Sequence, residues 1–327
     1  MLSKLIEEFS AASASKQALL VAAGVGTVAA TAVGAYYVKK RIDNTPPKQW
    51  RRAGEINEIF VYPIKSCGPI KVSRIGCSSL GPQRQMLRDR IFMVTNEDGK
   101  FVTARQKPKM VLIRPQFDSS FERMTLSAPG MDDITVDVKA LLDGPQSNGV
   151  VWGETVPTVD CGDAVAKWFS TYILGADKGY RLKFYPLNET CRKKSNEDSG
   201  SLQDETSYML FNTATVEDLN TRLEQKVTAL QFRPNFVVKG PPAYAEDNWR
   251  WVKIGNTVFR YVKPCLRCVF TNIDPAKGVS NQEGQPLKTL KGYRKIPALG
   301  ESPAFGIHLG LRKAGEVSLG DPVYYGC

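Results

Sequence analysis

The chain has 327 residues, and its 44 lysines and arginines outnumber 33 acidic residues, which gives a net charge of +11. This charge suits an acidic protein partner, an anionic membrane or a nucleic acid, but we find no nucleic-acid-binding motif. The single histidine disfavours a structural zinc site, which needs about four ligands, and the irregular spacing of the seven cysteines argues against a disulfide framework.

The first predicted element is a membrane anchor. Residues 18–38 carry no charge and are rich in Ala, Val and Gly, and Lys39-Lys40-Arg41 follow them. Roughly 20 such residues cross a bilayer as a helix, whereas the apolar core of a cleaved secretory signal has about 7–15. The cations after the stretch predict that the rest of the chain stays in the cytosol. We interpret residues 1–45 as an anchor with its linker, similar to a signal anchor of the mitochondrial outer membrane, with the endoplasmic reticulum as the alternative.

From residue 54 onward the apolar pattern has mostly a period of two, which is typical of β-strands. Short strands at this spacing predict a barrel or a bent sheet. Helices are predicted at 161–174 and 215–225, and the polar stretch 193–204 predicts a mobile loop. The expected fold is one compact unit, mainly β with a few helices (α+β). The predicted strands include 56–64, 90–94, 110–113, 134–138, 180–184, 208–211, 236–238, 251–254, 258–262, the run after Cys268, 305–309 and 323–325.

The stretch Cys265-Leu266-Arg267-Cys268 carries the most distinctive chemistry. An arginine near a thiol favours the thiolate, and a thiolate is a soft ligand that selects transition metals. A thioredoxin-like redox pair normally opens a helix after a strand, whereas residues 269–273 have an extended pattern. Buried, unreactive cysteines are the ordinary alternative for free thiols.

The run from Cys268 to Gly278 resembles the signature of the MOSC domain, the molybdenum-cofactor sulfurase C-terminal fold, in which a cysteine followed by x-x-Thr-x-x-Asp-Pro-x-x-Gly ligates molybdenum. The resemblance implies that Cys268 is the metal ligand and the catalytic residue. Four further strings match in the family's order, although each alone is also typical of an ordinary turn or surface ion pair. They are Tyr62-Pro63-Ile64-Lys65-Ser66, Leu87-Arg88-Asp89-Arg90, Thr206-Ser207 and Phe232-Arg233-Pro234-Asn235. By resemblance, the molybdenum cofactor is bound by Lys65, Ser66, Arg90, Thr206, Ser207, Arg233, Asn235 and Cys268.

The match extends from Gly54 to Tyr324 and, with the anchor, resembles the amidoxime-reducing, membrane-bound branch of this family. It implies an N-terminal β-barrel-like domain at 54–178 and a barrel-like MOSC domain at 180–327. It also implies reduction of N-hydroxylated compounds (amidoximes, hydroxylamines and N-oxides, with nitrite as a further candidate). The electrons would come from cytochrome b5 and its NADH-dependent reductase. The chain itself shows no glycine-rich dinucleotide fingerprint.

Two other functions stay open for the same residues. Cys268 can carry a persulfide in a sulfur carrier or sulfurtransferase, or the chain can be a membrane-tethered cofactor store or adaptor without turnover. His308 stands where the family is expected to have a tyrosine, and it is either a proton donor near neutral pH or a structural histidine. We expect Asp274 to fix the ligand loop rather than to transfer protons.

Overall fold

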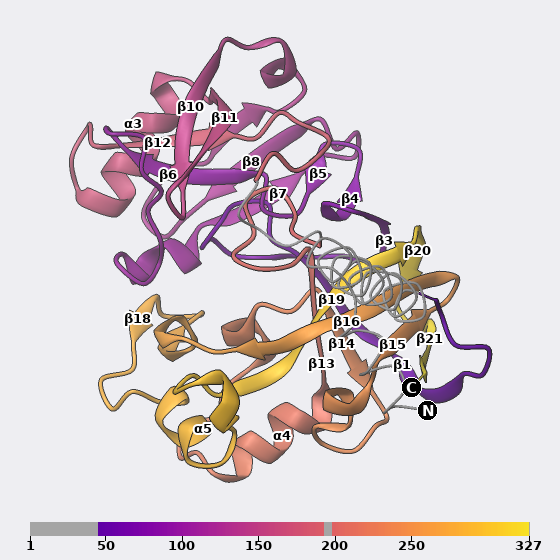
Figure 1. Cartoon of the computed structure of the whole chain (residues 1–327). Helices are drawn as coiled ribbons and strands as arrows, with labels where there is room; N and C mark the ends of the chain where they lie inside the picture. Colours follow the sequence, from indigo (N-terminus) through magenta and orange to yellow (C-terminus); the bar gives the residue numbers. More distant parts are fainter. Residues whose placement is uncertain (1–44, 193–197, 327) are drawn as a thin grey trace, which may run out of the picture. The chain divides into compact units, whose positions relative to one another are not determined.

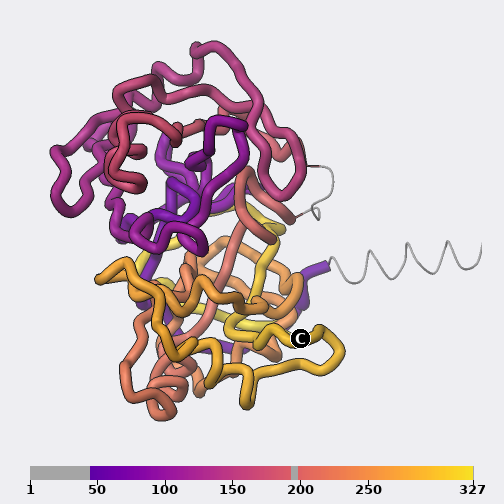
Figure 2. Tube along the Cα trace, turned by 90° about the vertical axis from the view of Figure 1, so that its left-hand side faces the viewer, coloured from indigo at the N-terminus to yellow at the C-terminus, as the bar shows by residue number. Residues whose placement is uncertain are grey.

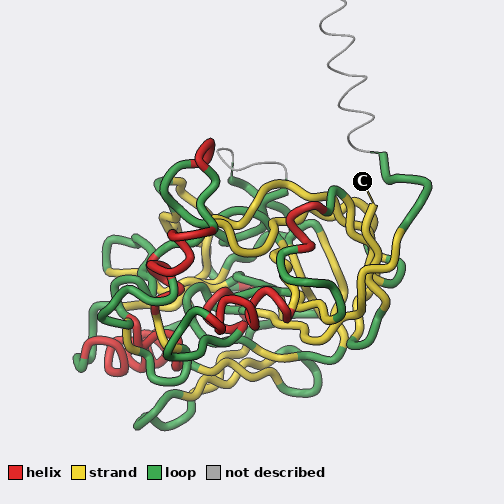
Figure 3. The backbone as a smooth tube through the Cα atoms, turned by 90° about the horizontal axis from the view of Figure 1, so that it is seen from below, coloured by secondary structure: helices red, strands yellow, loops and turns green. Residues whose placement is uncertain are grey.

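The computed structural model describes residues 45–192 and 198–326. The anchor predicted at 18–38 lies outside these described residues. In the part that the structure describes, no helix has both the length and the apolar character that spanning a membrane requires. Strands and loops dominate this part, and its helices are short (Figure 3).

A closed barrel of seven strands combines β1, from the N-terminal part of the chain, with six strands from its second half (Figure 1). Its order is β14-β13-β19-β16-β15-β21-β1, and β1 pairs back onto β14 to close the ring. The pairing of β13 with β14 is parallel, and the other pairings in the ring are antiparallel. The strands are β1 (Arg51–Val61), β13 (Tyr208–Asn212), β14 (Phe236–Lys239), β15 (Trp251–Ile254), β16 (Thr257–Leu266), β19 (Ala304–Lys313) and β21 (Pro322–Gly326).

Both faces of β13 are buried, which explains its nearly continuous apolar sequence. Successive side chains of a strand point to opposite faces. Tyr208 and Leu210 therefore pack into one hydrophobic cluster, and Met209 and Phe211 pack into another. Helix α4 (Thr213–Thr221) supplies Leu219 to the second cluster. The strand is thus packed on both faces, shortly after Thr206, which lines the cavity described below.

Two sheets and one helix form most of the chain between β1 and β13, which Figure 2 shows in the colours from indigo to magenta. Helix α3 (Asp163–Leu174) buries Trp168 and Phe169 in the same cluster as Phe92 and Phe184. A third sheet combines three N-terminal strands with β20 (Gly315–Ser318) from the C-terminal part. The sheets contain β6 (Phe92–Asn96), β10 (Gln146–Val151), β11 (Glu154–Asp160) and β12 (Tyr180–Phe184); β7 (Arg114–Phe117), β8 (Arg123–Ser127) and β9 (Ile134–Asp137); and β3 (Arg74–Ser78), β4 (Gly81–Arg84) and β5 (Leu87–Arg88).

Short elements complete the described chain. They are β2 (Ile70–Lys71), β17 (Ile273–Asp274), β18 (Val279–Ser280), α5 (Leu287–Tyr293) and the 3₁₀ helices η1 (Pro108–Leu112), η2 (Ala140–Asp143), η3 (Ala229–Phe232), η4 (Ala245–Asn248), η5 (Val269–Asn272) and η6 (Pro297–Leu299).

The mainly β fold with a barrel-like core is confirmed, but several local predictions are wrong. Residues 269–272 form the 3₁₀ helix η5 rather than a strand, because the Thr271 N–H turns back onto the carbonyl of Cys268. The strand predicted at 110–113 is largely η1, which Pro108 opens. Helix α4 begins earlier than predicted, since the side chain of Asn212 accepts a hydrogen bond from the Thr215 N–H and caps it.

Two strands pair with strands on the other side of the predicted domain boundary between 54–178 and 180–327. The two domain ranges stay predictions. Strand β1 (Arg51–Val61) pairs with β14 and β21 and so belongs to the C-terminal barrel. Strand β12 (Tyr180–Phe184) pairs with β6 and β11 of the N-terminal part. The N-terminal part is therefore inserted between the first and second strands of the barrel in chain order.

Candidate functional site

A cavity of about 170 Å³ gathers side chains from segments that are far apart in the sequence. Seven of the eight residues predicted to bind a cofactor line it, and their contact with a cofactor stays a prediction. Ser207 is the exception, because its hydroxyl donates to the carbonyls of Ser79 at 2.5 Å and Asp198 at 3.1 Å. The lining includes Lys65, Ser66, Arg90, Arg105, Gln203, Asp204, Glu205, Thr206, Arg233, Asn235, Cys265, Arg267, Cys268 and His308.

Cys268 offers the accessible thiol of the cavity. It lies between the end of β16 and the start of η5, and the N–H and hydroxyl of Thr271 both donate to its carbonyl, at 3.1 and 3.0 Å. Its side chain is exposed, whereas Cys265 is buried. Burial raises the pKa of the Cys265 thiol, so Cys265 stays protonated at neutral pH. The geometry therefore singles out Cys268 of the pair.

Asp274 and Gly278 shape the loop after Cys268. The Asp274 carboxylate accepts hydrogen bonds from the N–H groups of Ala276 at 2.8 Å and Lys277 at 3.2 Å. The Gly278 N–H donates to the Asp274 carbonyl at 2.8 Å, and Gly278 has a left-handed φ of +65°. These contacts agree with a structural role for Asp274 in the loop.

Arg267 is turned inward and does not contact Cys268. Its Nε and Nη2 donate to the carbonyl of Phe305, at 2.9 and 2.5 Å, and its Nη1 donates to the carbonyl of Phe232 at 2.8 Å. The guanidinium is buried, and burial lowers its pKa. Arg267 thus braces β19 and adds a positive charge beneath the cavity, while a different arginine reaches the Cys268 sulfur: Nη1 of Arg105 lies 4.0 Å from it.

Arg90 and Arg233 share the ring of one tyrosine. Their guanidinium carbons lie 4.4 and 4.2 Å from the centroid of Tyr62. Arg90 forms an ion pair of 2.6 Å with Asp89, and Arg233 donates from Nη1 to the carbonyl of Cys67 at 2.6 Å. Burial, with the nearby charge of Arg90, lowers the pKa of Arg233 to about 10, so it remains a cation at neutral pH.

Three of these lining residues have a left-handed backbone although they are not glycine. The φ angles are +71° for Ser66, +48° for Arg90 and +52° for Arg233. Non-glycine residues avoid this region, and such strained conformations concentrate at functional sites. The backbone thus turns three of the predicted binding residues toward the same cavity at an energetic cost.

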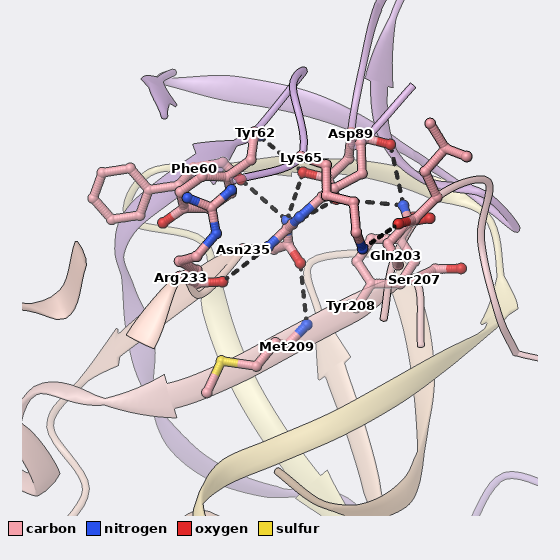
Figure 4. A network of polar contacts seen from close by, with 12 residues as sticks. Phe60, Tyr62, Lys65, Asp89, Gln203, Ser207, Tyr208, Met209, Arg233 and Asn235 are labelled. Atoms are coloured by element: carbon pink, nitrogen blue, oxygen red, sulfur yellow. Dashed lines mark hydrogen bonds and ion pairs between the residues drawn. The ribbon is translucent and has the colours of Figure 1, made fainter. Parts of the chain in front are cut away.

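Asn235 holds the site together rather than facing a ligand with free groups (Figure 4). Its Nδ2 donates to the carbonyl of Phe60 and to Oδ1 of Asp89, each at 3.2 Å, and its Oδ1 accepts from the Met209 N–H at 3.1 Å. Both amide hydrogens are therefore used inside the protein. Because Asp89 also pairs with Arg90, Asn235 positions Arg90 indirectly.

Lys65 already has an anionic partner in the cavity. Its ammonium is buried, donates to the Leu202 carbonyl at 2.9 Å and forms an ion pair with Asp204. Burial lowers the pKa of Lys65, and the negative charge of Asp204 partly offsets this shift. The positive charge of Lys65 in turn keeps the pKa of Asp204 below its usual value, although burial acts in the opposite direction. Half of the Asp204 side chain is exposed, which leaves this carboxylate accessible to solvent.

His308 lines the cavity and contacts Thr206. Its Nδ1 lies 2.9 Å from the Thr206 hydroxyl. That hydroxyl donates to the Tyr208 carbonyl at 2.9 Å. Burial and the charges of Arg267 and Lys263 lower the pKa of His308 to about 3. The imidazole is therefore neutral near pH 7, and an imidazolium is not available there as an acid.

The family models described as "MOSC N-terminal beta barrel domain" and "MOSC domain" match residues 53–176 and 197–324. The chain is 36% identical to mitochondrial amidoxime reducing component 2 of Bos taurus over 299 residues, which are 84% of this chain and 87% of that protein. It is 34% identical to mitochondrial amidoxime-reducing component 1 of Homo sapiens over 319 residues, 92% of either chain. The chain belongs to the mitochondrial amidoxime-reducing component family. A solved structure, the YUAD protein from Bacillus subtilis, covers 85% of this chain and 100% of its own at 9% identity, and its TM-score of 0.34 is too low to support the fold assignment.

The cavity of this family member suits an anionic group. Five cations and two carboxylates line it. Nη2 of Arg233 is buried and has no hydrogen-bond partner among the described residues, and Arg267 contacts carbonyls instead of a carboxylate. Burying a cation without a counter-ion is costly. A ligand that carries a phosphate would offset this cost, so the residues present fit a phosphorylated cofactor.

A metal at Cys268 would need further ligands from such a cofactor. Within residues 45–192 and 198–326, no group of three or more His, Cys, Asp and Glu side chains is placed to hold a metal ion. A dithiolene brought by the cofactor supplies soft sulfur ligands of the same kind as the Cys268 thiolate. The Cys268 thiolate of this chain is therefore suited to a cofactor that brings its own metal together with the other sulfur ligands.

Sequence reasoning missed Arg105, Gln203 and Asp204 as lining residues. Gln203 donates from Nε2 to the carbonyls of Leu80 at 2.9 Å and Asp89 at 3.1 Å, which draws its segment over the cavity. Residues 198–204 were included in a predicted mobile loop, and this is wrong for Ser199, Ser201, Leu202 and Gln203, which are buried. The Ser199 hydroxyl donates to the Glu205 carbonyl at 2.7 Å, whereas the Ser201 hydroxyl and Oε1 of Gln203 are buried without a hydrogen-bond partner among the described residues.

Proposed function

We propose that this chain is a molybdenum-cofactor enzyme that reduces N-hydroxylated compounds, namely amidoximes, hydroxylamines and N-oxides, with nitrite as a further substrate. The observation that carries the proposal is the exposed thiol of Cys268 on a cavity lined by five cations. The names of the relatives, amidoxime reducing components, support the reaction class.

In this proposal Cys268 holds the metal, and Lys65, Arg90 and Arg233 hold the phosphate and the other electron-rich parts of the cofactor. When bound, the cofactor supplies the two electrons and the acceptor for the substrate oxygen. Arg233 is ready to donate because its Nη2 is unpaired. Lys65 must share or exchange its contact with Asp204.

The remaining predicted residues position this set. Asn235 orients Asp89, which pairs with Arg90. Ser66 contributes its left-handed backbone, which turns the loop after Lys65 at the cavity wall. Thr206 contacts the neutral His308 and lines the cavity. Ser207 fixes the same strand start from outside the cavity by its bonds to Ser79 and Asp198.

Electrons would reach the site from cytochrome b5 and its NADH-dependent reductase. The net charge of +11 favours docking of an acidic haem protein. The uncharged stretch 18–38 would anchor the chain in the mitochondrial outer membrane, with the catalytic part facing the cytosol. The proposed location extends the word "mitochondrial" in the names of the relatives.

Metal analysis beside an activity assay tests the proposal. We expect about one molybdenum per purified chain and reduction of benzamidoxime when NADH, cytochrome b5 and its reductase are supplied. Cys268→Ala should stay folded and lose activity. Cys161→Ala is the matched control, because Cys161 is a partly buried thiol outside the cavity lining, and it should keep both metal and activity.

The other functions predict different results. Protein without molybdenum that carries a persulfide on Cys268 would establish the sulfur carrier and contradict the reductase. Protein with molybdenum that does not reduce benzamidoxime would indicate a store or adaptor. Full turnover by Cys268→Ala would refute the ligand assignment.

A further inference from the structure

Arg105 presents nearly unused hydrogen-bond donors beside Cys268. Its Nε lies 3.5 Å from the Thr103 hydroxyl and its Nη1 lies 4.0 Å from the Cys268 sulfur, and both contacts are long. The side chain is partly exposed and lines the cavity. A guanidinium has five N–H donors in a planar fork, so Arg105 retains the capacity to bind an oxygen acceptor next to the thiol.

Trp152 holds this guanidinium in place. The ring centroid of Trp152 lies 4.9 Å from the guanidinium carbon of Arg105, and its Nε1 donates to Oδ1 of Asp204 at 3.2 Å. Phe101 packs on the indole, with the ring centroids 5.0 Å apart. The indole is thus tied to the cavity wall on one side and stacked on Arg105, which lies next to Cys268.

The turn that carries Trp152 is built against local preference. Trp152 joins β10 to β11 with a φ of +52°, and Gly153 follows with a φ of +78°. Tight hairpin turns with two positive φ angles favour Asn or Asp before Gly, and a bulky residue in this region is strained. The side chain is also 44% exposed. Neither local geometry nor core packing explains a tryptophan here, whereas its contacts with cavity residues do: the indole lies against Arg105 and Lys65 and donates to Asp204, and Arg105 is the nearer of the two cations.

We propose that Arg105 binds the substrate, by donating hydrogen bonds to the oxygen of its N–O group, and that Trp152 is a positioning residue for Arg105. The inference rests on the proposed function, because that function brings the N–O group to Cys268. The ligand class is small N-oxygenated compounds with an accessible oxygen. N-oxides and nitrite carry more negative charge on oxygen than a neutral amidoxime and therefore depend on Arg105 most.

The test measures binding and turnover on the cofactor-loaded full chain. Without reductant, calorimetric titration with nitrite, pyridine N-oxide and benzamidoxime gives Kd for wild type, Arg105→Gln and Arg105→Lys. Losing a hydrogen bond to a charged group corresponds to a Kd about 10- to 100-fold higher. We expect this for nitrite and the N-oxide in Arg105→Gln, a smaller rise for benzamidoxime, and unchanged molybdenum content. In turnover, KM should rise more than kcat falls.

Arg84→Gln is the matched control, since Arg84 is exposed and stacks on Phe121 at 4.6 Å outside the cavity lining. It should bind all three compounds like wild type. For Trp152, the readout is a double-mutant cycle. Trp152→Ala should weaken nitrite binding in the wild-type background and have little further effect in Arg105→Gln.

Each failure points to a different assumption. Equal Kd values in Arg105→Gln and wild type overturn the substrate role of Arg105, and additive losses in the cycle overturn the positioning role of Trp152. If wild type contains no molybdenum and does not reduce benzamidoxime, the proposed function fails and the role of Arg105 fails with it. If wild type turns over while Arg105→Gln binds normally, only the present inference is wrong.

Discussion

Replacing Asn235 with alanine removes one buried amide that connects three segments of the site. The side chain is 1% exposed. The substitution takes a donor from the Phe60 carbonyl and from Oδ1 of Asp89, and an acceptor from the Met209 N–H. Oδ1 of Asp89 still accepts a hydrogen bond from the Tyr62 N–H at 2.9 Å. The groups left without this partner are therefore mainly the Phe60 carbonyl and the Met209 N–H.

The magnitude follows from these two groups. A buried polar group that loses its partner costs about 1–3 kcal/mol, so we expect Asn235→Ala to lower the free energy of unfolding by roughly 3 kcal/mol. The assay is unfolding of the full chain in urea, monitored by tryptophan fluorescence. The free energies of unfolding of wild type and variant are compared where their m-values are equal. Arg90 should also be held less firmly, because Asn235 orients its partner Asp89, and molybdenum occupancy should fall.

Asn235→Asp separates loss of contacts from electrostatics. In this variant a carboxylate oxygen replaces Nδ2 of Asn235, which lies 3.2 Å from Oδ1 of Asp89. Burial and the neighbouring carboxylate would raise the pKa of the new acid above its unfolded value. Stability is then lost as pH rises, so the deficit relative to Asn235→Ala should grow between about pH 4 and pH 7. A loss below about 1 kcal/mol for Asn235→Ala, or equal stability of the two variants at pH 7, would refute the reasoning.

Two further predictions concern stability. Gly278→Ala should lower the free energy of unfolding, measured by denaturation, by about 2–4 kcal/mol, because the new Cβ would lie 2.8 Å from Leu112 in a left-handed conformation. Gly130→Ala is the control, since Gly130 has a φ of +75° but open space around it, and it should lose only the part due to backbone strain. Equal losses in the two variants would contradict the packing argument. Burial raises the pKa of Glu246 to about 7, so its protonated form is favoured in the folded state. The stability of wild type relative to Glu246→Gln should therefore fall by about 2 kcal/mol between pH 5 and pH 8, and a difference that does not change with pH would show that burial leaves this carboxyl unperturbed.

The residues of the cavity were largely predictable from short strings, while their individual tasks were not. Lys65, Arg90 and Arg233 stand in recognisable strings and line the cavity. The string that contains Asn235 does not reveal that Asp89 and Met209 use its amide. Hydrogen-bond partners far apart in the chain depend on tertiary structure.

Other parts of the site gave no local signal. Arg105 follows Thr103-Ala104 in a stretch without secondary-structure periodicity, and its importance depends on Trp152 and Cys268. The extended pattern of 269–273 predicted a strand, but the hydrogen bonds of Thr271 to Cys268 formed a 3₁₀ turn instead. A short apolar run fits either structure, and one local contact decides between them.

The place of β1 in the barrel constrains how the chain can fold during synthesis. Strand β1 leaves the ribosome first, yet its neighbours β14 and β21 begin only at Phe236 and Pro322. The intervening sheets can therefore form their own core while the ring is still open. Only Phe60 and Val61 of β1 pair early, with β2, while the rest of β1 waits for β14 and, until translation is nearly finished, for β21. Unpaired strand edges recruit foreign strands. A nascent-chain chaperone that shields residues 51–61 would thus be most needed in the interval before the final strand appears.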